Sequence, residues 1–261
     1  MNIAVCVRQV PSTETRITVS PQTDLVDLKG VEWVINPYDE YALEEALRIR
    51  ERLGGTVTAI SLGPERAKTS LKTALATGAD AALFISDPVL DNADSYVTAQ
   101  ALAAALKRGS YDLILCGVRG VDDDMGYVGP AIAEFLNLPH VASIVKLEIA
   151  ADAKSARVHR EVASATEIIA VSLPAVLTAQ KGLNEPRYPS LRGMMLAGKK
   201  EIPVLRLSDL GLEPDALKPR TSVLKAMLPP ERKAGRIIEA PTPVEAAHEL
   251  VRALREEAKV I

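Results

Sequence analysis

The first half of the chain alternates short, largely apolar runs with segments whose apolar residues recur at helical spacing. The apolar runs predict strands at Ile3–Val7, Thr56–Leu62, Ala81–Ile85 and Asp112–Cys116. The segments between and after them predict helices at Tyr38–Leu53, Glu65–Ala76, Ser95–Lys107 and Gly129–Leu136. Strands without polar alternation, each followed by a helix, indicate a parallel sheet covered on both faces. We therefore predict a doubly wound α/β fold whose ligand lies beyond the carboxyl ends of the strands.

The pattern changes after about Pro139. Three runs, Ser143–Ile149, Ala156–Val162 and Glu167–Ser172, predict a β-meander, and Leu173–Ala179 predicts one more strand. Six prolines and scattered charges between Leu207 and Pro243 predict an extended arm, and an amphipathic helix is expected at Val244–Lys259. We expect residues 1–206 to form the α/β domain and residues 207–261 to wrap a partner chain, with a solvated surface tail as the alternative.

Composition and charge narrow the classes of function. The 261 residues are 48% hydrophobic but only 3% aromatic, so the core is aliphatic and a base-stacking surface is not expected. The net charge of −3 provides no field for nucleic acid. Two cysteines, Cys6 and Cys116, lack metal-ligand spacing, which fits a reducing cytoplasm without structural zinc. Neither a targeting segment nor an apolar run of membrane-spanning length is present, so we expect a cytoplasmic protein without membrane insertion.

The loop between Cys116 and Pro130 carries the most chemistry. It reads CGVRGVDDDMGYVGP, leaves a strand end, contains four glycines and enters a helix. Such a loop can direct backbone N–H groups at a phosphate, and it can equally be an acidic turn. The run Asp122–Asp124 suits capping of the following helix better than metal binding, because adjacent carboxylates cannot all face one ion.

A second loop suits protein docking. Residues 183–191 read LNEPRYPSL, and Met194 and Met195 follow them. Exposed Leu and Met side chains on a proline-braced loop are typical of a contact surface, although the loop could also fold onto its own core.

Several ordered blocks together resemble the beta subunit of electron transfer flavoproteins. They span nearly the whole chain, and the segment around LNEPRYPSL is the most specific of them. The blocks are CVRQVP at 6–11, NPYDEYALEEA at 36–46, SLGPE at 61–65, ALATGAD at 74–80, the loop at 122–130, the segment 172–202 and PPERKAGRI at 229–237.

The resemblance implies an adenine nucleotide alpha hydrolase-like fold and a heterodimer with an alpha subunit. In this family the redox FAD is held mainly by the alpha subunit, and Thr13 and Tyr38 match positions near its ring. Arg160 and Glu161 match a pair that contacts the swinging flavin domain. Leu191 matches the leucine that anchors flavin-dependent dehydrogenases such as acyl-CoA dehydrogenases, and Met194 and Met195 extend that docking surface.

The resemblance also implies a second adenine nucleotide within this subunit. It is AMP in conventional members and a second FAD in electron-bifurcating members. Matching positions are Cys6, Asn36, Leu62, Asp122, Asp124, Met125, Gly126, Tyr127 and Val128. Conventional members have Asn-Gln-Thr where this chain has Gly126-Tyr127-Val128, and bifurcating members have Thr in place of Met125. Because unpaired phosphates beside three Asp residues are costly, the loop favours AMP over FAD, with Arg8 or Arg119 as the phosphate partner.

The family implies an electron carrier between flavin-dependent dehydrogenases and a quinone-linked or other acceptor, as in fatty acid oxidation, rather than a stand-alone catalyst. One alternative is a bifurcating member that takes electrons from NADH. An alternative from another class is a stand-alone adenine-nucleotide-binding enzyme or sensor. The phosphate-loop glycine that would precede the lysine of GPERAKTS (63–70) is absent, which argues against the latter.

Overall fold

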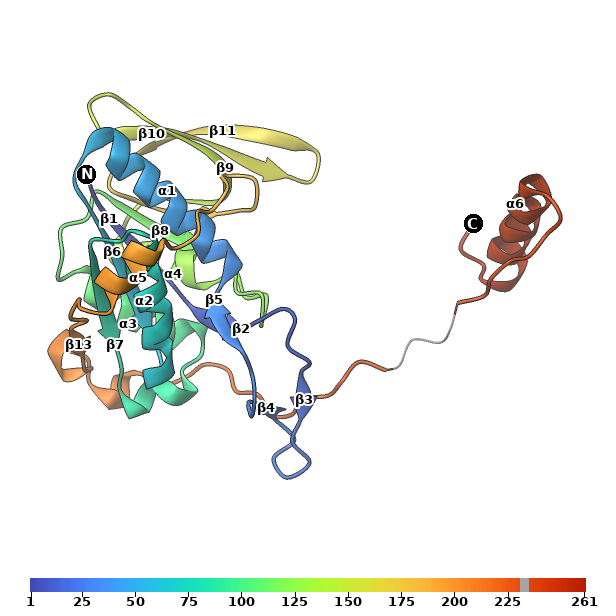
Figure 1. Cartoon of the computed structure of the whole chain (residues 1–261), viewed down its shortest axis with the longest axis horizontal. Helices are drawn as coiled ribbons and strands as arrows, with labels where there is room; N and C mark the ends of the chain where they lie inside the picture. The colour runs from blue at the N-terminus through green and yellow to red at the C-terminus, as the bar shows by residue number, and fades with distance from the viewer. Residues whose placement is uncertain (231–234) are drawn as a thin grey trace.

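A computed structural model describes residues 1–230 and 235–261 as an α/β domain with an extended C-terminal segment (Figure 1). Its main sheet has nine strands in the order β11-β10-β9-β12-β8-β1-β6-β7-β13. The parallel strands are β1 (Asn2–Cys6), β6 (Thr56–Leu62), β7 (Ala81–Ile85), β8 (Leu113–Gly117), β12 (Ala175–Ala179) and β13 (Val204–Leu205). The predicted fold class is therefore confirmed, and four of these strands are buried along nearly their whole length.

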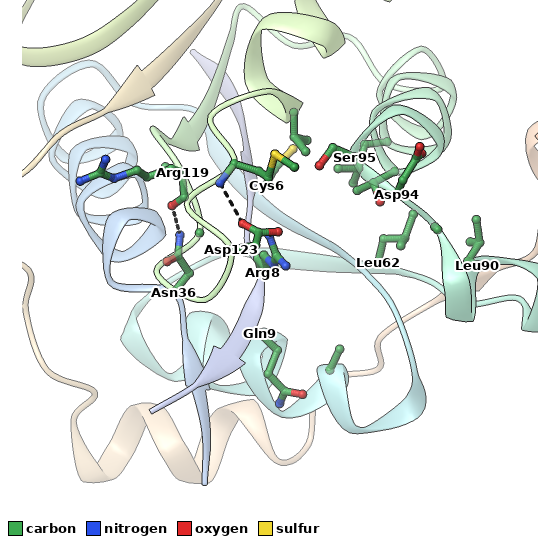
Figure 2. A pocket seen from close by; sticks show the side chains of 18 of the residues that line it. Cys6, Arg8, Gln9, Asn36, Leu62, Leu90, Asp94, Ser95, Arg119 and Asp123 are labelled. Carbon is green, nitrogen blue, oxygen red and sulfur yellow. Dashed lines mark hydrogen bonds and ion pairs between the residues drawn. The ribbon is translucent and has the colours of Figure 1, made fainter. Parts of the chain in front are cut away.

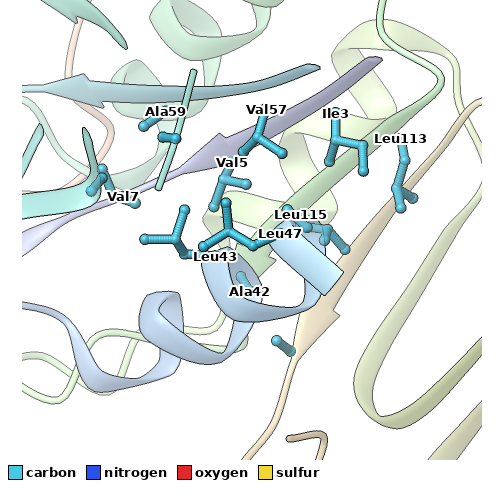
Figure 3. Close-up of a cluster of buried hydrophobic side chains, with 14 of the residues drawn as sticks. Ile3, Val5, Val7, Ala42, Leu43, Leu47, Val57, Ala59, Leu113 and Leu115 are labelled. Atoms are coloured by element: carbon cyan, nitrogen blue, oxygen red, sulfur yellow. The ribbon is translucent and has the colours of Figure 1, made fainter. Parts of the chain in front are cut away.

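Helices cover both faces of this sheet. On one face lie α1 (Pro37–Leu53), α2 (Lys68–Thr77) and α5 (Leu191–Ala197), and on the other lie α3 (Ser95–Leu106) and α4 (Val128–Leu136). The α1 face is shown in Figure 3, where Leu43 and Leu47 pack against Val5 and Val57 of the sheet. Almost all core side chains are aliphatic, as the 3% aromatic content requires. The two-sided covering explains why the parallel strands carry no polar alternation.

The meander predicted after Pro139 is present. It consists of β9 (His140–Ile149), β10 (Ser155–Val162) and β11 (Ala165–Ser172), which pair antiparallel in sequence order. The next strand, β12, returns to lie between β8 and β9 and runs parallel to both. One sheet thus joins the parallel half to the meander, whose outer hairpin projects beyond the helices (Figure 1).

Two small ribbons between β1 and α1 were not predicted. One pairs β2 (Gln9–Pro11) with β5 (Trp33–Ile35), and the other pairs β3 (Thr18–Val19) with β4 (Val26–Asp27). Short 3-10 turns were also not predicted. They are η1 (Glu65–Ala67), η2 (Pro88–Asn92), η3 (Ser208–Leu210) and η4 (Pro214–Ala216).

The C-terminal segment becomes extended after residue 217. Leu207 and Leu217 are still buried in the α3 side of the core, so the chain between them packs on the domain. Residues 218–230 are extended, and Ala226 N donates to Asp24 O beside the β3–β4 ribbon. The last helix, α6 (Pro243–Arg252), continues as a π-helical turn (η5, Ala253–Glu257), has no buried residue and lies apart from the sheet (Figure 1). Residues 231–234 of the PPERKAGRI block lie outside the described residues.

Among the described residues, no helix combines the length and the apolar character that a membrane crossing requires.

Candidate functional site

A pocket of about 800 Å³ lies at the carboxyl edge of the parallel sheet (Figure 2). Strands β1 and β6 end at its wall with Cys6 and Leu62, and β8 contributes its last two residues, Cys116 and Gly117. The N-terminal residues of α3 and α4 complete it from the other side. It occupies the place where open parallel sheets bind ligands, and its volume is in the range of cofactor sites.

Two residues of the NPYDEYALEEA block hold the pocket wall together. The Asp39 carboxylate accepts a hydrogen bond from Arg8 N (2.7 Å) and another from Gly117 N (2.8 Å), which joins the ends of β1 and β8. The Asn36 side chain donates to Arg119 O (2.9 Å), as Figure 2 shows, and accepts from Val121 N (3.2 Å). A Cβ at Gly117 would lie 2.3 Å from Asp39 Oδ1, so this contact requires glycine. The block therefore fixes the loop after β8 in addition to starting α1.

Burial has a large effect on the ionisation of Asp39. Loss of solvation raises the pKa of the Asp39 carboxyl from 3.8 to about 7, against the hydrogen bonds from Arg8, Asn36 and Gly117, which lower it. This carboxyl therefore takes up a proton within the physiological pH range.

The acidic run binds arginines instead of capping the next helix. Asp122 and Asp123 each contact Arg8 at 2.8 Å, and Asp124 contacts Arg119 at 3.0 Å. The N-cap of α4 is Tyr127, whose side chain makes no capping hydrogen bond, so the predicted capping role of the three acids was wrong. Their carboxylates find stronger partners in the two guanidinium groups that reach the loop. The amides at the start of α4 are left without intrahelical partners, as at any helix N-terminus.

The C-terminal segment forms part of the pocket wall. Pro219, Thr221, Ser222 and Val223 line it, and Asp94 anchors them there. One Asp94 oxygen caps α3 through Val97 N (2.9 Å), and the other accepts from Arg220 N (2.6 Å) and Thr221 N (2.9 Å). Sequence reasoning missed this role, although an Asp directly before a predicted helix is a recognisable capping signal.

The pocket gathers part of the predicted nucleotide set. Cys6, Asn36, Leu62, Met125 and Val128 line it. Asp122, Asp124, Gly126 and Tyr127 belong to the same loop but are not among the lining residues, whereas Asp123 is. Cys116 also lines the pocket and was not predicted to do so. Within the described parts of the chain, no group of three metal-ligating side chains occurs.

Thr13 and Tyr38, the positions expected near a flavin, lie at opposite ends of the β2–β5 ribbon. Thr13 follows Pro11, which pairs with Trp33, whereas Tyr38 follows Ile35, which pairs with Gln9. The Tyr38 hydroxyl accepts a hydrogen bond from Arg119 Nη2 at 3.2 Å, and the Arg119 guanidinium lies 5.5 Å from the centre of its ring. Tyr38 is therefore tied to the pocket loop, and Thr13 is exposed in the turn after β2.

The expected docking residues are on the surface. Leu191 starts the short helix α5 and is 79% exposed, and Met195 is 72% exposed on the same helix, with Met194 between them in the chain. Ser190 caps this helix through Gly193 N (3.0 Å). Arg160 and Glu161 lie on β10, where Arg160 approaches Glu167 of β11 at 3.5 Å.

This architecture defines a class: a doubly wound α/β protein with a ligand pocket at its sheet edge and a separate exposed apolar loop. A sequence model of the electron transfer flavoprotein domain matches residues 24–210. The chain is 43% identical over its full length to the full-length electron transfer flavoprotein subunit beta of Bacillus subtilis. It is 38% identical to the caffeyl-CoA reductase-Etf complex subunit CarD of Acetobacterium woodii, with 98% of each chain covered. It is also 36% identical to Protein FixA of Azotobacter vinelandii, over 78% of this chain and 74% of FixA. The chain belongs to the electron transfer flavoprotein beta-subunit family.

Proposed function

We propose that this chain is the beta subunit of a heterodimeric electron transfer flavoprotein. In this role it carries electrons between flavin-dependent dehydrogenases, such as acyl-CoA dehydrogenases, and a quinone-linked or other acceptor. The observation that carries the proposal is that one domain combines a sheet-edge pocket with a separate exposed loop that ends at Leu191. The partner alpha subunit supplies most of the FAD site, and FAD supplies the redox chemistry when it is bound.

The exposed apolar side chains of the C-terminal segment support the proposal that this segment wraps a partner chain. Val223, Leu224 and Met227 of the extended stretch are each more than three-quarters exposed, although they are large apolar residues. Helix α6 likewise leaves Val244 and Leu250 exposed. Exposed apolar side chains of this kind are typical of a segment that is buried against another chain. We assign that chain as the alpha subunit.

We propose that the pocket holds an adenine nucleotide. Its wall presents the amide of Asn36, the apolar surface of Leu62 and Val128, and the backbone at the start of α4. Aliphatic side chains suit a purine ring, and a helix N-terminus suits a phosphate.

Charge in the acidic loop favours AMP as this nucleotide. Arg8 and Arg119, the cations expected to pair with phosphate, are already paired with Asp122, Asp123 and Asp124. A nucleotide with one phosphate adds less unpaired negative charge to this loop than a dinucleotide does. One observation favours the second candidate, FAD with NADH as donor: the pocket of about 800 Å³ is larger than AMP requires.

Nucleotide analysis of the purified complex tests these proposals. The chain is co-expressed with a candidate alpha subunit, the complex is purified, and its visible spectrum is recorded. The complex is then denatured and the released nucleotides are separated by chromatography. One FAD and one AMP per heterodimer is the expected result. Two FAD would establish the second candidate.

Two further outcomes would overturn the carrier proposal. One is a complex that shows no flavin band even after reconstitution with FAD. The other is a chain that is monomeric and turns over ATP alone, which would establish a stand-alone nucleotide enzyme.

A further inference from the structure

The only two cysteines of the chain lie side by side at the end of the parallel sheet. Cys6 ends β1 and Cys116 lies near the end of β8. These strands pair in parallel with Val5 opposite Leu115, so one more step of the same register sets Cys6 opposite Cys116. Opposed residues of neighbouring strands point to the same face, and both cysteines belong to the core cluster on the α3 side.

The backbone spacing is compatible with a disulfide bond. Neighbouring strands lie about 4.8 Å apart, and disulfide-bonded residues have Cα separations of about 4.4 to 6.8 Å. Both cysteines are free in this structure. Cys116 is followed by Gly117, the last residue of β8, so the bond would form at the end of the strand.

Both thiols can be reached from the pocket. Cys6 is 7% exposed and Cys116 is 5% exposed, and both contribute to the pocket wall (Figure 2 shows Cys6 there). A small oxidant that enters the pocket therefore meets the pair, whereas a protein disulfide would be too large.

We propose that Cys6 and Cys116 are a redox modification site, which forms an intramolecular disulfide in the pocket wall when hydrogen peroxide enters. The Cys6 thiolate attacks one peroxide oxygen, breaks the O–O bond and becomes a sulfenic acid, and the released hydroxide takes up a proton to give water. The Cys116 sulfur then attacks the sulfenic sulfur, forms the S–S bond and expels a second water. Two thiols lose two electrons to one peroxide, and a dithiol reductant reverses the change.

The order of attack follows from the environment of the two thiols. The adjacent Cys6 thiol and burial raise the pKa of the Cys116 thiol well above its usual value, so Cys116 remains protonated at neutral pH. We therefore assign the first attack to Cys6 and the resolving step to Cys116.

The modification would make the pocket sensitive to oxidants. A disulfide draws the two sulfur atoms to about 2.05 Å and removes both S–H groups from the wall. This consequence rests on the proposed nucleotide site: a bound nucleotide would cover the thiols and slow their oxidation, and the disulfide would in turn weaken nucleotide binding.

Peptide mapping of the full-length protein tests the disulfide without any variant. The protein is treated with hydrogen peroxide, free thiols are blocked with iodoacetamide, and the sample is digested with trypsin without a reductant. Tryptic cleavage after Arg8, Arg108 and Arg119 places the cysteines in peptides 1–8 and 109–119. The expected product is these two peptides joined by a disulfide, and treatment with dithiothreitol separates them. Two alkylated peptides, separate sulfinic acids, or a link only between two copies of the chain would overturn the proposal.

Oxidation in the presence of AMP separates this inference from the proposed nucleotide site. Saturating AMP should slow formation of the linked peptides about tenfold. If the link forms at the same rate with and without AMP, the dithiol site stands and the nucleotide assignment of this pocket fails. The variants Cys6→Ala and Cys116→Ala serve as matched controls, since each should abolish the intramolecular link.

Discussion

Arg187 and Glu44 form a two-pronged ion pair that holds the exposed loop 182–190 on helix α1. Arg187 Nε donates to Glu44 Oε2 at 2.8 Å and Nη2 donates to Oε1 at 3.1 Å. The Glu44 side chain is 3% exposed, and Arg187 also binds Glu51, about two turns further along α1. Because α1 begins beside the pocket at Asn36, one helix positions both the pocket wall and the loop expected to dock partners.

We predict that Arg187→Gln destabilises the protein by about 1 to 3 kcal/mol. The change leaves the buried Glu44 carboxylate short of a charged partner, which is costly, although Arg48 still contacts it at 2.6 Å. The loop should also become more accessible to trypsin at Lys181. Urea unfolding and limited proteolysis measure the two effects.

The matched control is Arg192→Gln. Arg192 is an exposed arginine just beyond the same loop, so its loss should change the free energy of unfolding by less than about 0.5 kcal/mol. Equal stabilities of the two variants would show that the pairing of Arg187 with Glu44 contributes nothing to the free energy of unfolding.

The docking role of Leu191 predicts a change in rate without a change in stability. Leu191→Ala removes an exposed side chain, so the heterodimer should fold and unfold as the unmodified protein does. Loss of an apolar anchor at a contact surface should slow electron transfer from an acyl-CoA dehydrogenase about tenfold at limiting dehydrogenase concentration. Stopped-flow reduction of the bound flavin measures this. Leu53→Ala, an exposed leucine at the end of α1, is the control, and equal rates for the two variants would remove the anchor role.

Ionisation of Asp39 predicts a pH dependence of stability. Burial raises the pKa of this carboxyl to about 7, whereas in the unfolded chain it ionises near its ordinary value of 3.8. Between these two values the folded state holds one more proton than the unfolded state. The free energy of unfolding therefore falls as pH rises through this window, by about 1.4 kcal/mol per pH unit, and is level above it.

The variant Asp39→Asn isolates this effect. Other carboxyls with raised pKa values, such as Glu45 and Asp122, are present in both proteins and cancel in the comparison. An amide accepts hydrogen bonds at one oxygen only, so the variant carries a constant penalty that does not depend on pH. Urea unfolding of both proteins between about pH 5 and pH 8 should show the stability difference shrinking as pH rises. Parallel pH profiles would mean that Asp39 is ionised throughout.

The local hydrophobic pattern was sufficient to predict the strands that are covered on both faces of the sheet. Thr56–Leu62 and Ala81–Ile85 coincide with β6 and β7, because a short run without charged residues and rich in β-branched or aliphatic residues favours a buried strand. The short helix Leu191–Ala197 and the two-residue strand Val204–Leu205 were not predicted. Each depends on a distant partner, α2 for the helix and β7 for the strand, and carries too few residues to show a period.

The hydrophobic pattern predicted the place of the candidate site, at the carboxyl ends of the parallel strands, whereas its individual residues were implied by the family resemblance. Cys6, Leu62 and the loop after β8 meet because parallel strands end at one edge of the sheet. The contacts of Asp94 with Arg220 and Thr221, and of Glu44 with Arg187, join residues more than a hundred positions apart. No local pattern encodes such pairs, since their geometry is set by the packing of whole elements.

Gly129 packs closely on Thr178. A substitution at Gly129 should therefore lower the stability of the protein, and a second substitution at Thr178 should restore it. A Cβ at Gly129 would lie 2.4 Å from Thr178 Cγ2, and every other atom near it is at least 3.8 Å away. Gly129→Ala should therefore push α4 away from β12 and destabilise the protein by about 1 to 3 kcal/mol, despite the better helix propensity of Ala. Thr178→Ser removes Cγ2 but keeps the hydroxyl that accepts from Ser143 N (3.1 Å).

The double variant Gly129→Ala/Thr178→Ser should regain most of the stability lost by Gly129→Ala alone. Thr178→Ser alone should cost about 1 kcal/mol for the lost methyl group, and the new Ala methyl fills the same space in the double variant. A double-mutant cycle from urea unfolding should then give a favourable coupling of about 1 to 2 kcal/mol between the two positions. Additive losses would contradict the contact and would mean that α4 meets β12 elsewhere. Because Gly129 also lines the pocket, AMP binding to the four proteins should follow the same cycle, with the weakest binding in Gly129→Ala.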